Sequence, residues 1–142
     1  MRALLDITVL LAMLDEDHVH HSRARAWWAE NRDHGWASCP LTQNGYVRIV
    51  SGPGYTNPIH IADGFATLSR QLTAFGHEFW PADISLLDSE SFNHSRILGP
   101  KQITDVYLLA LAVKNDGRFV TLDRGIPLAV VRGAEARHLV VI

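Results

Sequence analysis

The chain has 142 residues, 47% of them hydrophobic, which is enough for a sizeable buried core. Its formal net charge of -2, from 13 basic and 15 acidic residues, excludes a strong overall attraction to nucleic acid or to an anionic membrane. The single cysteine, Cys39, excludes an internal disulfide and favours a reducing compartment. These features predict a single domain over residues 1–142 in a cytoplasmic protein with no membrane span and no targeting segment.

The first half of the chain predicts two strands, each followed by helices. Residues 2–8 contain a short apolar run that leads into Asp6 and Thr8. An apolar run without polar alternation is typical of a strand buried on both faces. A short helix should follow up to residue 14, with the Thr8 hydroxyl as its N-cap. A second helix is expected over residues 22–31. A strand over residues 36–39 ends at Pro40, which also suits the first turn of the next helix.

That third helix should cover residues 41–50, and an amphipathic helix over residues 59–75 should end at Gly76 as its C-cap. A strand over residues 77–81 is then followed by a short helix and a loop. The remaining predicted elements are an apolar helix opened by Asp105 and strands over residues 118–123 and 138–142. Strands that alternate with helices indicate right-handed crossovers. The predicted fold is therefore α/β, with a mostly parallel central sheet flanked by helices on both faces.

Three aspartates should meet at one edge of this sheet. Asp6 and Asp123 each follow an apolar strand, and Asp105 opens the long apolar helix. Ligands of open α/β sheets bind at the carboxyl ends of the strands, because the connecting loops form a crevice there. Carboxylate oxygens are the ligands that Mg²⁺ prefers, so the three acids together suggest a divalent metal site.

Two of these acids also have a purely structural explanation. Asp105 can serve as an N-cap or as a first-turn acid favoured by the helix dipole. Asp123, followed by an arginine and a glycine, can be a turn aspartate. Asp6 is harder to explain in this way, because a carboxylate beside a buried strand needs a hydrogen-bonding partner or a metal ion.

Four segments of the chain carry a family resemblance. They are residues 4–8 (LLDIT), 39–48 (CPLTQNGYVR), 103–110 (ITDVYLLA) and 120–125 (VTLDRG). In this order and near this spacing they resemble the PIN-domain ribonuclease toxins of VapC type, the toxin halves of bacterial type II toxin–antitoxin pairs. The resemblance covers nearly the whole chain and implies a PIN-like domain.

It also implies an activity and partners. The expected function is a magnesium- or manganese-dependent endoribonuclease that hydrolyses RNA phosphodiester bonds through an activated water. The resemblance further implies a homodimer that is neutralised by a cognate VapB-type antitoxin. Transfer RNA and ribosomal RNA are possible substrates.

The resemblance assigns roles to individual residues. Asp6, Asp105 and Asp123 match the family's catalytic acids and are the expected metal ligands. Gln43 stands where most members carry glutamate, and its carbonyl oxygen offers a ligand without charge. The Thr8 hydroxyl is expected to hold a ligand or a phosphate oxygen. The expected substrate-binding residues are Thr121, Arg124, Arg96 and Lys101.

Alternatives remain at this stage. Because of Gln43, the chain could be a catalytically silent PIN domain that binds RNA or an antitoxin without cutting. A phosphatase of the haloacid-dehalogenase type also begins on a strand that ends in aspartate, but it requires a second aspartate at the position of Thr8. Trp27 and Trp28 could stack on bases, although their place in a helix favours the core.

Overall fold

The computed structural model describes residues 1–74 and 76–142, which contain one five-stranded sheet. Its strands are β1 (Ala3–Leu5), β2 (Trp36–Ser38), β3 (His77–Phe79), β4 (Arg118–Thr121) and β5 (Leu139–Val141). The strand order is β3-β2-β1-β4-β5, and every neighbouring pair is parallel. The predicted α/β fold is confirmed. Because the strands are parallel and β1 is central, the carboxyl ends of β1, β2 and β4 share one edge of the sheet.

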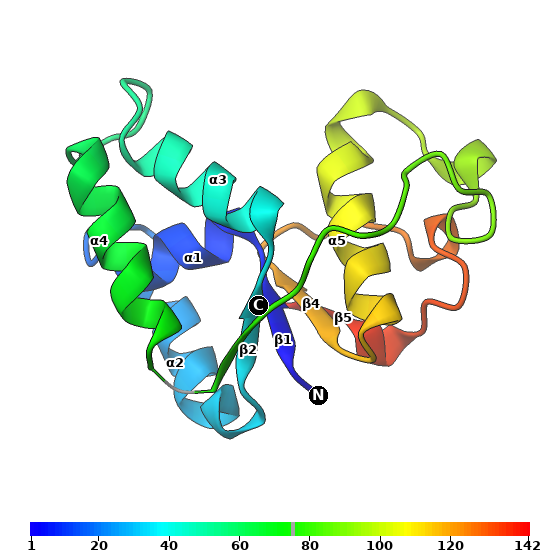
Figure 1. Cartoon of the computed structure of the whole chain (residues 1–142), viewed down its shortest axis with the longest axis horizontal. Helices are drawn as coiled ribbons and strands as arrows, with labels where there is room; N and C mark the ends of the chain where they lie inside the picture. The colour runs from blue at the N-terminus through cyan, green and yellow to red at the C-terminus, as the bar shows by residue number, and fades with distance from the viewer. Residues whose placement is uncertain (75) are drawn as a thin grey trace.

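Helices cover both faces of this sheet. They are α1 (Ile7–Leu14), α2 (His21–Asn31), α3 (Pro40–Val50), α4 (Ile61–Leu72) and α5 (Ile103–Lys114). Figure 1 shows α1 to α4 on one side of the strands and α5 on the other. Within the described residues, no helix combines the length and the apolar character needed to cross a membrane.

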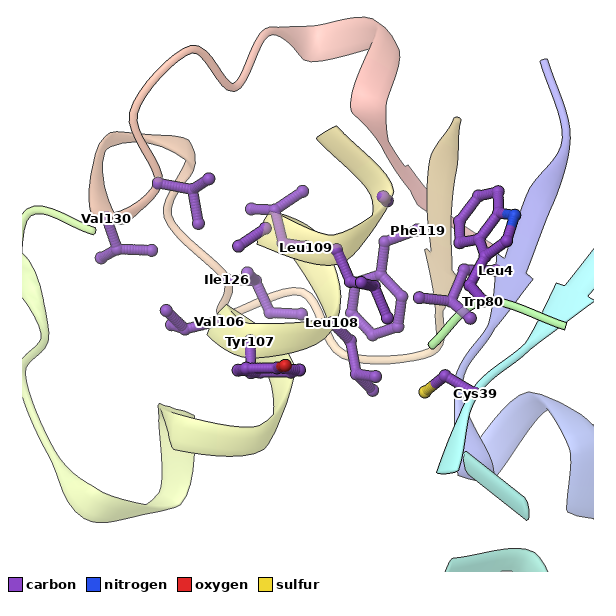
Figure 2. Packing of buried hydrophobic residues seen from close by; sticks show 14 of the residues in the cluster. Leu4, Cys39, Trp80, Val106, Tyr107, Leu108, Leu109, Phe119, Ile126 and Val130 are labelled. Carbon is purple, nitrogen blue, oxygen red and sulfur yellow. The ribbon is translucent and has the colours of Figure 1, made fainter. Parts of the chain in front are cut away.

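The core on the α5 side fixes the helix that carries Asp105. Residues 106–112 of α5 are all buried, and they pack in one cluster with Leu4 and Phe119 of the sheet. Trp80, which follows β3, and Cys39 belong to the same cluster (Figure 2). A helix surrounded in this way is apolar on nearly all sides, and its position relative to the strands is therefore tightly determined.

On the opposite face, α1 and α3 approach each other at a glycine. A Cβ atom on Gly45 would lie 2.2 Å from Cδ1 of Ile7, so a larger residue at this position would displace the Ile7 side chain. Tyr46 and Val47, the next residues of α3, are buried in the core on this side together with Val9 of α1. As a result, α3 lies directly against the residue that follows Asp6.

Two predicted helix caps are wrong. α1 begins at Ile7, so its N-cap position is Asp6, and Thr8 lies inside the first turn. The Thr8 hydroxyl bonds the Asp6 carboxylate instead of a backbone N–H. α4 ends at Leu72 with Thr73 as its C-cap, and Gly76, with φ 63°, lies in the connection to β3. Residue 75, the last residue of the predicted helix, lies outside the described residues.

The polar stretch before α5 contains no α-helix. It forms two 3-10 turns, His94–Arg96 and Pro100–Gln102, and α5 then begins at Ile103. Asp105 therefore lies within the first turn of α5 and does not occupy its N-cap position. The N-cap position of α5 is Gln102.

Candidate active site

Asp6 lies between β1 and α1 and is only 6% exposed. Its Oδ2 accepts hydrogen bonds from Thr121 Oγ1 at 2.7 Å and from Thr8 Oγ1 at 3.0 Å. Burial raises the pKa of Asp6, the two hydroxyls and the Ile7 N–H lower it in part, and the charge of Asp123 raises it. The carboxylate is thus held in one orientation in a position where its charge is poorly solvated.

Thr121 has a different role from the predicted one. It is the last residue of β4 and has no exposed surface, so its hydroxyl is out of reach of a substrate. That hydroxyl donates to Asp6 and accepts a bond of 3.0 Å from the Asp123 N–H. Thr121 therefore positions two of the three acids relative to each other.

Asp123 is exposed and lies in the loop after β4. Its Oδ1 accepts a 2.7 Å hydrogen bond from the Gly125 N–H, which is the geometry of a turn aspartate. One carboxylate oxygen of Asp123 therefore has the role of a turn aspartate that the sequence suggested. Among the described residues, its other oxygen has no hydrogen-bond partner.

Asp105 completes the group from the opposite side of the sheet. It is half-buried in the first turn of α5, and its pKa is raised to about 6, first by burial and then by the charges of Asp6 and Asp123. The negative charges of the three acids therefore act on one another. Within the described residues, the ion pairs involve other acids, so no protein cation neutralises this cluster.

The chemistry of this cluster fits a divalent cation. Buried carboxylates that lack a cation are costly, and a bound metal ion would relieve their repulsion. In the part of the chain that the structure describes, no three His, Cys, Asp or Glu side chains are arranged as a ready-made metal cage. Mg²⁺ does not need one, because it keeps several waters and is usually held by one or two carboxylates together with substrate phosphate.

The structure does not join Gln43 to the three aspartates by a hydrogen bond. Its Nε2 donates to the buried Ser38 Oγ at 2.9 Å, and that oxygen is 2.8 Å from Nε2 of His77. Gln43 also lines a groove between α3 and α4. The Gln43 side chain therefore bonds to the last residue of β2, and its predicted catalytic role stays a prediction.

Two polar residues of α3, for which no place in the site was predicted, lie near the acids. Asn44 and Arg48 line a hollow of about 330 Å³ together with Ile7 and Thr104. Ile7 directly follows Asp6 and Thr104 directly precedes Asp105, so the hollow borders the acid cluster. The spacing of four residues, which places two side chains on one helix face, is the signal that could have identified them.

The predicted basic residues differ in their placement. Arg124 is exposed in the Asp123 loop, and the turn that contains Lys101 reaches this loop through a 3.4 Å hydrogen bond from Gln102 Nε2 to the Gly125 carbonyl oxygen. Arg96 lies in a separate turn that packs against Leu128–Val130. Arg124 and the turn that contains Lys101 thus lie near Asp123. Among the described residues, no hydrogen bond connects the Arg96 turn to the Asp123 loop.

Neither tryptophan side chain of α2 is fully exposed to solvent. Trp28 is buried in the core beneath α1, and Trp27 is half-buried with the Arg118 guanidinium 5.3 Å from its ring centroid. This arrangement agrees with the core interpretation and leaves base stacking without support.

Comparisons with known proteins agree with this architecture. The family model of the PIN domain matches residues 3–131. The chain is 55% identical over 139 residues to Ribonuclease VapC44 of Mycobacterium tuberculosis, covering 98% of each chain. It is 40% identical over 125 residues to Ribonuclease VapC38 of the same species, covering 87% of this chain and 86% of the relative.

A solved structure is similar in fold. It is the crystal structure of VapBC2 from Rickettsia felis bound to a DNA fragment from their promoter, with a TM-score of 0.58 and 11% identity. The match covers 87% of this chain and 89% of that chain. At this level of identity the likeness supports the fold alone.

Proposed function

The chain belongs to the PIN-domain family and, within it, to the VapC-type toxins, and from this premise we propose that it is a metal-dependent endoribonuclease. Its reaction is the hydrolysis of RNA phosphodiester bonds with magnesium or manganese as cofactor. The observation that carries this proposal is the cluster of Asp6, Asp105 and Asp123, which repel one another and have no neutralising cation among the described residues. Such a cluster suits a cation and the phosphate oxygens that the cation attracts.

Each residue of the cluster has a proposed role. Asp6, Asp105 and Asp123 hold the metal ion, directly or through its waters. A cation held there would supply an activated water for attack on the phosphodiester and a positive charge to offset the negative charge that develops on the phosphoryl oxygens. Thr8 and Thr121 keep the Asp6 carboxylate in one orientation.

The protonation state of Asp105 matters for this role. Because its pKa is about 6, Asp105 is ionised at neutral pH and protonated in mildly acidic solution. Only the ionised carboxylate is a good ligand for a hard cation. Activity is therefore expected to fall as the pH decreases through about 6.

RNA cleavage by antitoxin-free protein tests the proposal. Wild-type protein and Asp105→Asn are incubated with total transfer RNA and ribosomal RNA, with manganese or with a chelator. We expect cleavage only by the wild type and only with metal, while circular dichroism shows both proteins folded. Cleavage that persists in Asp105→Asn would remove this residue from the site.

We also propose a VapB-type antitoxin and a second copy of the chain as partners, in the cytoplasm where the RNA substrates are. The proposal is supported by the identity to VapC proteins and by the fold shared with the chain of VapBC2. Light scattering on the antitoxin-free protein is expected to give twice the mass of the chain. A monomer at micromolar concentration would contradict the proposed dimer.

The alternative function is a silent PIN domain that binds RNA or antitoxin without cutting. This alternative is considered because Gln43, which donates a hydrogen bond to Ser38, is uncharged. The same assay separates the two functions, because a folded wild-type protein that never cleaves, even with manganese, is the result that the silent module predicts.

A further inference from the structure

The hollow beside the acid cluster has no assigned role in the proposed reaction. Its walls include Ile7 and Thr104, the immediate neighbours of Asp6 and Asp105, and the α3 side chains Asn44 and Arg48. A polymeric substrate with one phosphate at the acids must continue past them on some side. The hollow lies where a neighbouring nucleotide of such a strand can be accommodated.

The packing of α3 brings Asn44 and Arg48 to this place. Gly45 lies against the Ile7 side chain, and a Cβ at this position would be 2.2 Å from Ile7 Cδ1. The two polar residues are four positions apart and therefore project from one face of the helix. Both are exposed, so the face that they form is accessible to a ligand.

The Arg48 side chain is unpaired within the part of the chain that the structure describes. Among the described residues it makes no hydrogen bond and no ion pair, whereas Arg2 pairs with Glu78 and Arg137 pairs with Asp116. Asn44 likewise has no side-chain hydrogen bond in the described residues. A guanidinium and an amide without partners among the described residues thus share one small hollow, whose walls include the chain neighbours of Asp6 and Asp105.

We propose that Arg48 and Asn44 form an RNA subsite that binds the nucleotide next to the scissile bond, with Arg48 on its phosphate and Asn44 on its sugar or base. A guanidinium matches the oxygens of a phosphate, and an amide offers both a donor and an acceptor to a hydroxyl or a base edge. The choice of RNA as the substrate class rests on the proposed function, whereas the subsite itself rests on the hollow and its two free side chains.

Binding that is measured without cleavage tests the subsite. The variants are made in the Asp105→Asn background, and the probe is a fluorescein-labelled single-stranded oligoribonucleotide of mixed sequence in the presence of a chelator. Anisotropy gives the dissociation constant at a series of KCl concentrations. Arg23→Ala is the matched control, because Arg23 is exposed on α2, and Figure 1 shows α1 between α2 and α3.

Arg48→Ala is expected to weaken binding on the order of tenfold and to lower the salt slope by about 0.7, the share of one phosphate on a single strand. Asn44→Ala should weaken binding without changing the slope, because an amide releases no counterion. Arg48→Lys keeps the charge and should restore the slope.

Arg48→Ala that binds the oligoribonucleotide as tightly as Arg23→Ala, with the same salt slope, overturns the subsite. This outcome is distinct from a failure of the proposed function, which is tested by the cleavage of RNA by the wild type. A wild type that does not cleave, combined with a lowered slope in Arg48→Ala, would retain the subsite as part of a binding module.

Discussion

Thr121 Oγ1 lies 2.7 Å from Asp6 Oδ2, although 115 positions separate the two residues in the chain. The contact exists because β4 pairs with β1 in parallel, which brings the ends of both strands to one edge of the sheet. The same hydroxyl accepts the Asp123 N–H. A single buried side chain thus connects the positions of two acids.

Removing this hydroxyl should disturb both acids. Thr121→Val keeps the shape of the side chain but leaves Asp6 with one donor fewer and the Asp123 N–H without its acceptor. We expect the free energy of unfolding in urea to fall by about 1–3 kcal/mol, with a marked loss of RNA cleavage. Thr121→Ser is the control, since it retains the hydroxyl and loses one methyl, worth ~0.8 kcal/mol. Equal losses in the two variants would show that the hydroxyl is not the important group.

Removing the charge of Asp105 should stabilise the metal-free protein. Its pKa in the folded state, about 6, exceeds the ordinary value of 3.8, so folding favours the protonated acid. The stabilisation of the fold by the protonated Asp105 is fully present below pH 3.8 and is lost as the pH rises to about 6. The asparagine in Asp105→Asn does not ionise, so this variant does not lose stability as the pH rises. In the presence of a chelator, its Tm should therefore exceed that of the wild type at neutral pH. The difference should shrink on acidification. A lower Tm at neutral pH would argue that the acids do not repel one another.

A methyl group at position 45 should separate α1 from α3. Gly45→Ala is expected to cost about 1–3 kcal/mol in urea unfolding, because the new Cβ overlaps Ile7. The double variant Gly45→Ala, Ile7→Ala removes the clash and should be more stable than the sum of the two single changes predicts. If the changes in unfolding free energy of the two single variants simply add in the double variant, residue 45 and Ile7 are not in contact.

A carboxylate at position 43 tests whether this side chain acts with the three aspartates. Gln43→Glu loses the N–H that bonds Ser38, and the new charge lies next to the Ser38–His77 contact. We expect no gain in RNA cleavage and a fall in unfolding free energy of about 1 kcal/mol. A large increase in cleavage would indicate that the side chain at position 43 acts together with the three aspartates.

The sequence predicts the sheet well because its signals are local. Apolar runs mark β1, β4 and β5, and the alternation of strands with helices leaves few topologies for a parallel sheet. The same logic brings Asp6 and Asp123 to one edge. These features depend on the type of each residue and not on the exact phase of any helix.

The parts that the sequence does not predict depend on tertiary packing. The bond from Thr121 to Asp6 requires the register of β4 against β1. The direction of Gln43 depends on where α3 starts, and the position of Arg48 depends on how closely Gly45 approaches Ile7. No local pattern specifies these distances, so the sequence alone does not determine the partners of single side chains.

Manganese binding, measured by electron paramagnetic resonance in the absence of RNA, tests the central claim most directly. At neutral pH the wild type is expected to bind Mn²⁺, with weaker binding below pH 6 where a proton competes for Asp105. Asp105→Asn and Asp6→Asn should each lose most of this affinity, whereas Arg23→Ala should bind as the wild type does. Binding of Mn²⁺ that is equal in all four proteins would contradict a metal site at the three aspartates.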